Sequence, residues 1–297
     1  MQTFLDDLAT ATTTITANPG STLPPETAKL ILNAALSVVP VTTTTSGGKE
    51  NARTATSALA LTSTVLAATD EIDEQTAQDA TAVLDFVMDQ PAAVESEQAT
   101  TQVQESIEAI GNAVMAGQSE NLVNDTVSIV ITTSNVNITS EKRKAEALTK
   151  TPAVCQTDAE EPAQVDMPTN ILSGATGFNA SEPIDFLFYS SKVNLHGNAP
   201  TSASDGTTGQ QGNTTLKSSL ISFSLRQGGV VIKVNGTSEP INITVPLTSG
   251  SNMTSRCIGI PSNATASGCE YALDCRYWDE GAGEWSASGC NTLQSAS

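Results

Sequence analysis

The spacing of apolar residues changes after Gly117, and this change limits the fold more than any other feature of the chain. Before it, apolar residues recur every three or four positions, as on one face of a helix. The clearest such stripe is Val103, Ile107, Ile110 and Val114. After it, apolar and polar residues alternate, as on a half-buried strand. Val127, Ile129 and Ile131 carry this alternation. Helices followed by strands predict an α+β fold or two packed subdomains.

The first 118 residues are predicted to form short helices. One opens at Pro24 and Pro25 and ends at Pro40, and a polar loop over residues 41–50 follows it. Three more are predicted over residues 51–69, 70–89 and 95–116. The acidic residues of 70–74 suit a solvated helix start, where carboxylates face the positive end of the helix dipole. They lack the glycine and the spacing of a calcium-binding loop.

The second part is predicted to be rich in β-structure. Val136 and Ile138 continue the alternation, and residues 141–150 are expected to form a charged turn or connector. Further short strands are predicted over residues 184–189, 220–225, 230–234 and 241–245, separated by Gly, Pro and Asn. Residues 197–215 are expected to be a long polar loop.

Charge and composition exclude several classes of function. Acidic residues number 32 against 13 basic ones, and a net charge of −19 does not suit a protein that binds nucleic acid. His196 is the only histidine, so a histidine-rich metal site is excluded, and we expect this residue to be a solvent or loop histidine. No cofactor motif is present, and no apolar run is long enough to span a membrane.

Two features favour an oxidising, secretory environment. Eight Asn-x-Ser/Thr sequences, all after residue 120, are candidate glycosylation sites: Asn124, Asn137, Asn179, Asn213, Asn235, Asn242, Asn252 and Asn263. Five cysteines are disulfide candidates: Cys155, Cys257, Cys269, Cys275 and Cys290. The odd count requires an unpaired cysteine or a partner elsewhere. Since the first residues also show no signal peptide, we expect the chain to be a fragment of a longer precursor.

The segment from Cys275 to Cys290 carries the most specific pattern. Its two cysteines enclose Trp278 and Trp285, the only tryptophans of the chain. The composition predicts a β-hairpin with arms over residues 276–279 and 284–286 and a glycine-containing turn over 281–283. The two indole rings are expected to supply buried apolar area that a chain with so few aromatic residues otherwise lacks.

This segment resembles the GPS motif that closes the GAIN domain of adhesion G-protein-coupled receptors and polycystin-like proteins. The matching residues are Cys275, Tyr277, Trp278, Gly283, Trp285, Gly289 and Cys290. Upstream, residues 238–247 resemble the family's strand with a Glu-Pro-(Val/Ile) step. The resemblance implies a helical subdomain over residues 1–120 and an antiparallel β-sandwich subdomain over residues 121–297. It also implies a structural core of Trp278, Trp285 and Gly289 within a partial motif over residues 275–290.

One departure from the family pattern bears on chemistry. In the family, Gly-Cys is followed by Cys-x-Cys and by His-Leu-(Ser/Thr), where the chain cuts itself. Neither run is present here, so the resemblance implies no enzyme activity for this chain, and self-cleavage only in a longer one. The family's disulfides join the two GPS cysteines to the two later ones. Cys275 and Cys290 are therefore expected to lack those partners or to pair with each other, and Cys257 and Cys269 to form a separate bridge.

The resulting expectation is a non-enzymatic, juxtamembrane GAIN-like region that couples an ectodomain to membrane spans of the same precursor. We expect it on the extracellular face of the plasma membrane or of another secretory membrane, with the rest of its precursor and an extracellular protein or glycan as partners. The alternative is a secreted or wall-associated acidic structural glycoprotein. An acidic hydrolase that uses paired carboxylates is a third hypothesis, supported by no motif.

Overall fold

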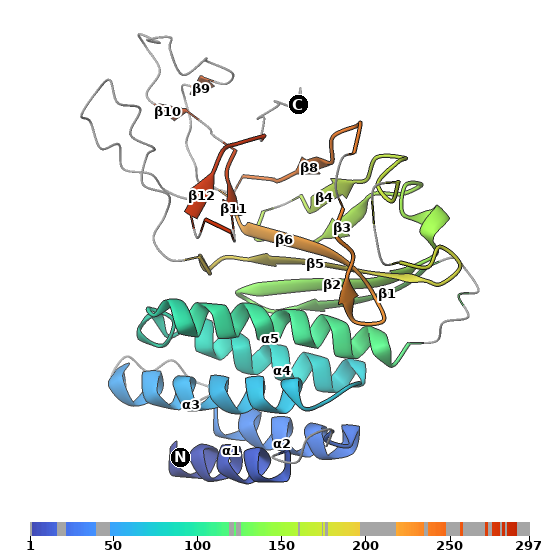
Figure 1. Ribbon diagram of the computed structural model, residues 1–297. Coiled ribbons are helices and arrows are strands. Elements are labelled where there is room, and N and C mark those ends of the chain that lie inside the picture. The colour runs from blue at the N-terminus through green and yellow to red at the C-terminus, as the bar shows by residue number, and fades with distance from the viewer. Residues whose placement is uncertain are drawn as a thin grey trace. The chain divides into compact units, whose positions relative to one another are not determined.

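The computed structural model describes residues 2–16, 22–39, 48–118, 122, 126–159, 161–173, 175, 178–196, 218–234, 237–247, 256–257, 271–272, 275–279, 281–282 and 284–289 (Figure 1). The chain divides into two compact units. The first consists of Met1–Gly197 and Ser218–Leu247, and the second of Asn198–Lys217 and Thr248–Ser297. The helices and the main β-sheets belong to the first unit, whereas the C-terminal hairpin belongs to the second.

Five α-helices lie among the described residues of the first unit, and the predicted helical part is confirmed. They are α1 (Gln2–Thr16), α2 (Pro25–Val38), α3 (Gly48–Ala67), α4 (Glu74–Met88) and α5 (Glu97–Ala116). A short 3₁₀ helix, Pro91–Ala93, connects the last two. The helix predicted over 70–89 begins only at Glu74, because Asp73 is its N-cap. Similarly, Ser96 caps α5 by accepting a hydrogen bond of 3.2 Å from the backbone N–H of Ala99.

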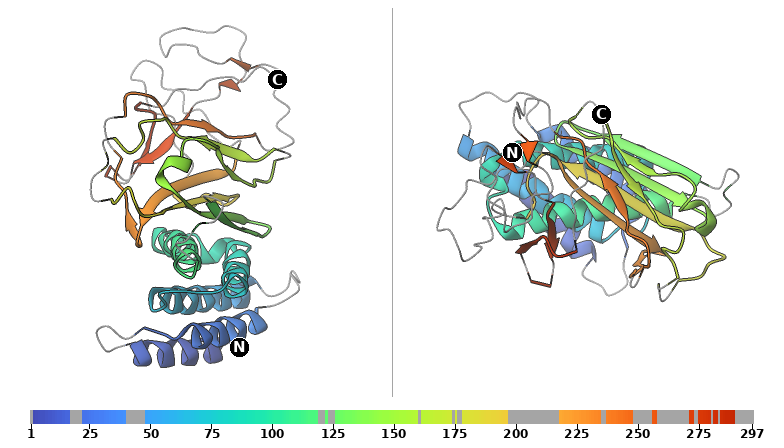
Figure 2. Two further views of the ribbon diagram at one scale, coloured as in Figure 1. Left: turned by 90° about the vertical axis from the view of Figure 1, so that its right-hand side faces the viewer. Right: turned by 90° about the horizontal axis from the view of Figure 1, so that it is seen from above.

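The helices form layers beneath the sheet, with α1 and α2 farthest from it and α4 and α5 against it (Figures 1 and 2). The stripe predicted on α5 is confirmed as core. Its four apolar side chains are completely buried: Val103, Ile107, Ile110 and Val114. They belong to a helix that packs against α3 and α4 on one side and against strands β2 and β5 on the other. Helix α5 is therefore covered on both sides, which explains its burial.

The larger sheet has five antiparallel strands. They are β1 (Thr126–Thr132), β2 (Val136–Arg143), β5 (Ile184–Ser191), β6 (Leu220–Gln227) and β7 (Val230–Val231), in the order β1-β2-β5-β6-β7. The register places Thr139 opposite Phe188 and Phe188 opposite Phe223. Strands β1, β2, β5 and β6 lie where the sequence predicts them. Strand β7 also lies within its predicted range, 230–234, but is only two residues long.

A smaller antiparallel sheet covers the other face of the large one, which makes the β part of the first unit a two-layered sandwich (Figure 1). Its strands are β3 (Ala153–Cys155), β4 (Ala163–Asp166) and β8 (Asn242–Thr244), in the order β3-β4-β8. Side chains of both sheets and of the adjoining turns form one apolar core: Leu148, Ala153, Cys155, Ala163, Val165, Ile171, Ile184, Phe186, Phe188, Leu225 and Ile232. The sandwich implied by the family resemblance is thus present, and β3 and β4 are strands that the sequence did not predict.

The prediction of a charged connector over residues 141–150 is wrong in its first part. Glu141, Lys142 and Arg143 are the last residues of β2, and all three are buried. They are tolerated there because each has an opposite charge nearby. Arg143 forms an ion pair with Glu141, and Lys142 Nζ lies 3.6 Å from Asp185 Oδ1 on β5. The connector begins only at Lys144, contains a 3₁₀ turn over Ala145–Ala147 and continues to the start of β3 at Ala153.

Helix α5 approaches the sheet closely at Gly111. A Cβ atom on Gly111 would lie 2.4 Å from Leu187 Cδ1 and 3.0 Å from Ser140 Oγ. A real Cβ atom does not occur at such a distance, so the absence of a side chain allows the helix to rest on β2 and β5. The glycine therefore sets the distance between the helical layer and the sheet.

Replacing Gly111 by leucine is expected to lower the free energy of unfolding by about 1–3 kcal/mol, because the added side chain overpacks this contact. Thr101→Leu is the matched control, since Thr101 lies on an exposed position of the same helix. Urea unfolding followed by circular dichroism measures both variants. An effect of Gly111→Leu no larger than that of Thr101→Leu would contradict the close contact.

Helix α4 also holds the turn between β1 and β2. Its Asp85 carboxylate accepts hydrogen bonds of 2.7 Å from Ser134 Oγ and of 2.7 Å from the backbone N–H of Asn135. The Asn135 side chain in turn donates to Asp89 Oδ1 at 2.8 Å. These contacts and Gly111 join the helical layer to the sheet at two separate places.

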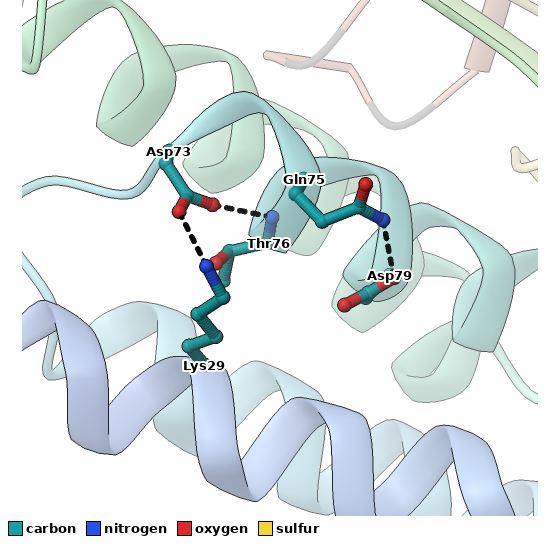
Figure 3. Close-up of polar contacts among 5 residues, drawn as sticks. All are labelled: Lys29, Asp73, Gln75, Thr76 and Asp79. Atoms are coloured by element: carbon teal, nitrogen blue, oxygen red, sulfur yellow. Dashed lines mark hydrogen bonds and ion pairs between the residues drawn. The ribbon is translucent and has the colours of Figure 1, made fainter.

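Within the helical layer, Lys29 of α2 and Asp73 at the start of α4 form an ion pair (Figure 3). Lys29 Nζ lies 2.8 Å from Asp73 Oδ2, and Asp73 Oδ1 accepts a hydrogen bond of 2.7 Å from the backbone N–H of Thr76. The hydrogen bond from Lys29 and those from Thr76 lower the pKa of Asp73 from its ordinary value of 3.8 to about 2.

This arrangement predicts a pH dependence. Because the folded-state pKa of Asp73 is depressed, its contribution to stability is present above pH 4 and is lost as the pH falls toward about 2. Asp73→Ala is expected to cost about 1 kcal/mol at pH 7, the usual value of an N-cap. Asp73→Asn, which keeps a capping oxygen but not the charge, is the matched control. Thermal unfolding from pH 7 to pH 2 compares them, and an alanine variant as stable as the native chain at pH 7 would contradict the capping role.

Candidate functional site

The C-terminal hairpin has the arms that the sequence predicts. Strand β11 (Tyr277–Asp279) pairs antiparallel with β12 (Glu284–Ser286). The register places Trp278 opposite Trp285, with Tyr277 opposite Ser286 and Asp279 opposite Glu284. Two tryptophans at directly opposed positions belong to one cross-strand pair, the unit that stabilises a two-stranded ribbon. The prediction of a hairpin around the two tryptophans is therefore confirmed.

The Asp279 side chain organises the turn of the hairpin. Its Oδ1 atom accepts hydrogen bonds from the backbone N–H groups of Gly281, at 2.9 Å, and Ala282, at 3.1 Å. Such an Asx-type contact fixes a turn from within. Gly289 follows the second arm with a φ of +74°, in the left-handed region that favours glycine. The glycine beside the last cysteine is thus required by the backbone conformation.

The expected burial of the two tryptophans can be assessed only for Trp285. The Trp285 side chain is half-buried, whereas the Trp278 side chain lies outside the described residues. Tyr277, at the start of the first arm, is 41% exposed. Within the hairpin, the Trp285 indole is thus partly covered, whereas Tyr277 and the turn residues Gly281 and Ala282 are exposed.

The cysteines occupy different environments. Cys275, directly before the hairpin, takes part in a disulfide bond. Cys257 is the last residue of β9 (Arg256–Cys257), which pairs parallel with β10 (Tyr271–Ala272). Cys269 and Cys290 lie outside the described residues.

Cys155 must be corrected as a disulfide candidate, because it is a free thiol. It ends β3, is fully buried in the sandwich core and lies 3.5 Å from the backbone oxygen of Asn137. Burial raises the pKa of the Cys155 thiol to about 11. A protonated, enclosed thiol is chemically inert at neutral pH, so this residue acts as a small core side chain.

His196 is a loop histidine, as one of the two predicted alternatives has it, but it is not fully exposed to solvent. The ring is half-buried beside Gln104 of α5, whose Nε2 atom lies 2.9 Å from His196 Nε2. Burial lowers the pKa of His196, which favours the neutral imidazole. His196 belongs to the first unit and the hairpin to the second. It therefore contributes to the contact between a loop and α5, and nothing in the structure assigns it a role as a base.

Three of the eight candidate glycosylation sites can be assessed, and Asn137 must be corrected. Asn137 is 7% exposed inside β2, flanked by β1 and β5, so a glycan on its side chain is incompatible with this fold. Asn179 and Asn242 are exposed. The other five candidates lie outside the described residues: Asn124, Asn213, Asn235, Asn252 and Asn263.

Sequence reasoning missed the charged residues inside the sandwich. The Arg143 guanidinium donates to the backbone oxygens of Thr151, at 2.8 Å, and Pro152, at 3.3 Å, and lies 5.9 Å from the centre of the Phe186 ring. Burial raises the pKa of its partner Glu141, although Arg143 opposes this effect. The only signal in the sequence was Glu141 and Arg143 two positions apart, which on a strand places both side chains on one face.

No group of three or more His, Cys, Asp or Glu side chains in the described part of the chain could hold a metal ion. No helix in that part is both long and apolar enough to cross a membrane.

A helical layer, a β-sandwich and a hairpin with Trp278 opposite Trp285 together define an α+β module of the GAIN type. A sequence model of the family described as GPS: GAIN subdomain B matches residues 126–297, which is more than half of the chain. The chain therefore belongs to this family, and both the resemblance and the α+β fold class predicted from the sequence are confirmed. No curated protein matches the chain. The family is generally non-enzymatic, and at most autoproteolytic.

Proposed function

We propose that this chain is a non-enzymatic, extracellular, juxtamembrane region of a larger polycystin-like or adhesion-receptor-like membrane protein. Its role is to couple an ectodomain to membrane spans of the same precursor. The observation that carries the proposal is the family match over residues 126–297, which includes the hairpin with Trp278 opposite Trp285. In this proposal residues 1–120 form the helical subdomain and residues 121–297 the β subdomain.

The contacts between helices and sheet support a coupling role. Helices α1 to α5 and both sheets of the sandwich form one compact unit. Asp85 joins α4 to the β1–β2 turn, and Glu108 of α5 forms an ion pair with Arg226 of β6. A displacement applied to the helical layer is therefore passed to the sandwich through polar contacts and through the packing around Gly111.

The proposal extends to the disulfide bonds. In this proposal Cys275 pairs with Cys290, and Cys257 pairs with Cys269. A bridge from Cys275 to Cys290 would enclose the hairpin and fix its two ends, because these cysteines directly flank the arms. Peptide mapping of the non-reduced protein identifies each pair.

The test uses the full precursor with an epitope tag fused ahead of the helical part. We expect antibody to label the tag on intact, non-permeabilised cells, and the tagged chain to stay with the membrane fraction after alkaline carbonate extraction. Recovery in the culture medium with no membrane-bound form would support the alternative of a secreted acidic structural glycoprotein. Recovery in the cytosol would contradict both readings.

The gene sequence that follows Ser297 gives an independent check. A Cys-x-Cys and His-Leu-(Ser/Thr) run followed by apolar spans would support the juxtamembrane role. If self-cleavage occurs in the precursor, the tag and a C-terminal marker separate on a denaturing gel but co-precipitate under native conditions. A stop codon without any span would overturn the proposal.

A further inference from the structure

Three candidate glycosylation sequences fall on described residues, and each lies in a different environment. Asn137 is enclosed within β2, and its Nδ2 atom lies 3.3 Å from Ser190 Oγ on the neighbouring strand. Asn242 is exposed at the start of the edge strand β8. Asn179 is exposed in the turn that precedes β5. The same three-residue motif therefore occurs in a central strand, in a turn and in an edge strand.

The turn at Asn179 brings the two reactive side chains of the motif together. Asn179 Oδ1 accepts hydrogen bonds from Ser181 Oγ, at 2.7 Å, and from the backbone N–H of Ser181, at 3.1 Å. Its Nδ2 atom donates to Glu182 Oε1 at 2.8 Å. A hydroxyl that donates to the amide oxygen withdraws electron density from the amide, and so makes its N–H protons more acidic. All of these contacts lie within three residues, so a chain that has not yet folded can form them.

The strand geometry at Asn242 does not allow this contact. Asn242 and Thr244 lie on β8, where residues two positions apart are separated by about 6–7 Å along the strand. The extended backbone at Asn242 therefore does not bring the Thr244 hydroxyl to the amide as the turn does at Asn179.

Gln227 of β6 holds the Asn179 turn by its backbone and leaves the acceptor side chain outside. Gln227 Oε1 accepts from the backbone N–H of Asn179 at 2.6 Å, and Gln227 Nε2 donates to the backbone oxygen of Asn179 at 2.9 Å. The same Nε2 lies 3.2 Å from the backbone oxygen of Pro183. The backbone is thus fixed against the sheet, while Asn179 as a whole is exposed and its amide contacts only residues of its own turn.

We propose that Asn179 is an N-glycosylated residue of this protein and that Asn137 is not. In the step, Asn179 Nδ2 forms a bond to the anomeric carbon of an oligosaccharide carried on a lipid diphosphate. The bond from that carbon to the diphosphate oxygen breaks, the diphosphate leaves with the electron pair, and a basic group of the transferase takes the proton from Nδ2. The nitrogen keeps one N–H, which is enough to donate to Glu182. This inference rests on the proposed extracellular function, because the donor lipid is supplied in the secretory pathway.

A glycan on Asn179 would lie near β7, which is an edge strand of the large sheet among the described residues. Gln227, which holds the turn, pairs with Val230 on the edge strand β7. Val230 is 68% exposed and Val231 is 47% exposed. An exposed apolar edge is a site of self-association, and a bulky hydrated substituent next to it shields it.

The test expresses the chain behind a cleavable secretory leader in a eukaryotic cell line and maps the glycan by mass spectrometry. Enzymatic release of the glycan in heavy-oxygen water marks each occupied asparagine as labelled aspartate. We expect the label at Asn179 in nearly all molecules and none at Asn137. Ser181→Ala should abolish the label at Asn179, whereas Ser181→Thr should retain it. An unmodified Asn179 in the secreted protein, or a modified Asn137, would overturn the proposal.

Two further measurements separate this inference from folding and from the proposed function. Asn179→Gln should increase aggregation much more than it lowers the melting temperature, because it removes the glycan that shields the edge, whereas the side-chain contacts it also removes lie within one exposed turn. The leader-driven chain tests the acceptor site alone. Glycan at Asn179 in that chain but not in the natural precursor would contradict the extracellular function and leave the site assignment intact. Its absence from both would contradict the site assignment.

Discussion

Replacing Phe188 by alanine is expected to lower the free energy of unfolding by about 3–5 kcal/mol, the usual cost of removing a buried aromatic side chain. Phe188 is completely buried at the centre of the five-stranded sheet. Its ring faces the core between the two sheets and meets the Phe186 ring edge-on, with 6.0 Å between ring centroids. The loss combines the transfer of the ring to water with a cavity that strands fixed on both sides cannot close.

Phe4→Ala is the matched control, because Phe4 on α1 is 47% exposed and should cost well under half as much. Both variants are measured by urea unfolding with fluorescence and far-ultraviolet circular dichroism. If Phe188→Ala lowered stability by no more than Phe4→Ala, Phe188 would not occupy the core of the sandwich.

The helical part could be predicted because its information is local. An apolar stripe such as that of α5 needs only the spacing of side chains along one segment. The first and last residues of the helices were harder to predict, because the position of a helix start depends on which side chain caps the backbone N–H groups. Asp73 caps α4 through the N–H of Thr76, and the predicted start at residue 70 therefore lies outside the helix.

Strands β3 and β4 were not predicted because they are three and four residues long. Such segments show too little alternation to be recognised, and pairing with each other and with β8 forms them. The end of β2 was missed for a different reason. Three consecutive charged residues indicate solvent when they are taken alone, and only their partners on neighbouring strands and loops make their burial tolerable.

The hairpin was the part of the candidate site that the sequence could predict, because turn chemistry is also local. The acceptor in the turn, Asp279, and the glycines around it determine which residues face one another. A local motif does not predict whether a site is accessible, because accessibility depends on the tertiary fold. Asn137 has the same three-residue motif as Asn179, but it lies in the middle of a sheet, where no substituent fits.

Replacing Arg143 by methionine is expected to cost about 3–5 kcal/mol at pH 7, the usual effect of removing one partner of a buried ion pair. The variant leaves the Glu141 carboxylate buried without its counter-charge. It also removes the donor to the backbone oxygens of Thr151 and Pro152. Methionine keeps most of the apolar volume, so the loss reports on charge and hydrogen bonding more than on packing.

The stability lost in Arg143→Met is expected to depend on pH. Burial raises the folded-state pKa of Glu141, so the contribution of this group to stability is greatest at low pH and is lost as the pH rises through that pKa. Without Arg143 the pKa rises further, and the difference in unfolding free energy between variant and native chain should shrink from pH 7 to pH 5. The double variant Glu141→Gln/Arg143→Met should recover part of the loss at pH 7 and show less of this pH dependence, since no carboxylate is left to titrate. A loss under about 1 kcal/mol for Arg143→Met at pH 7, well below the usual range, would mean that the pair contributes little to the sandwich.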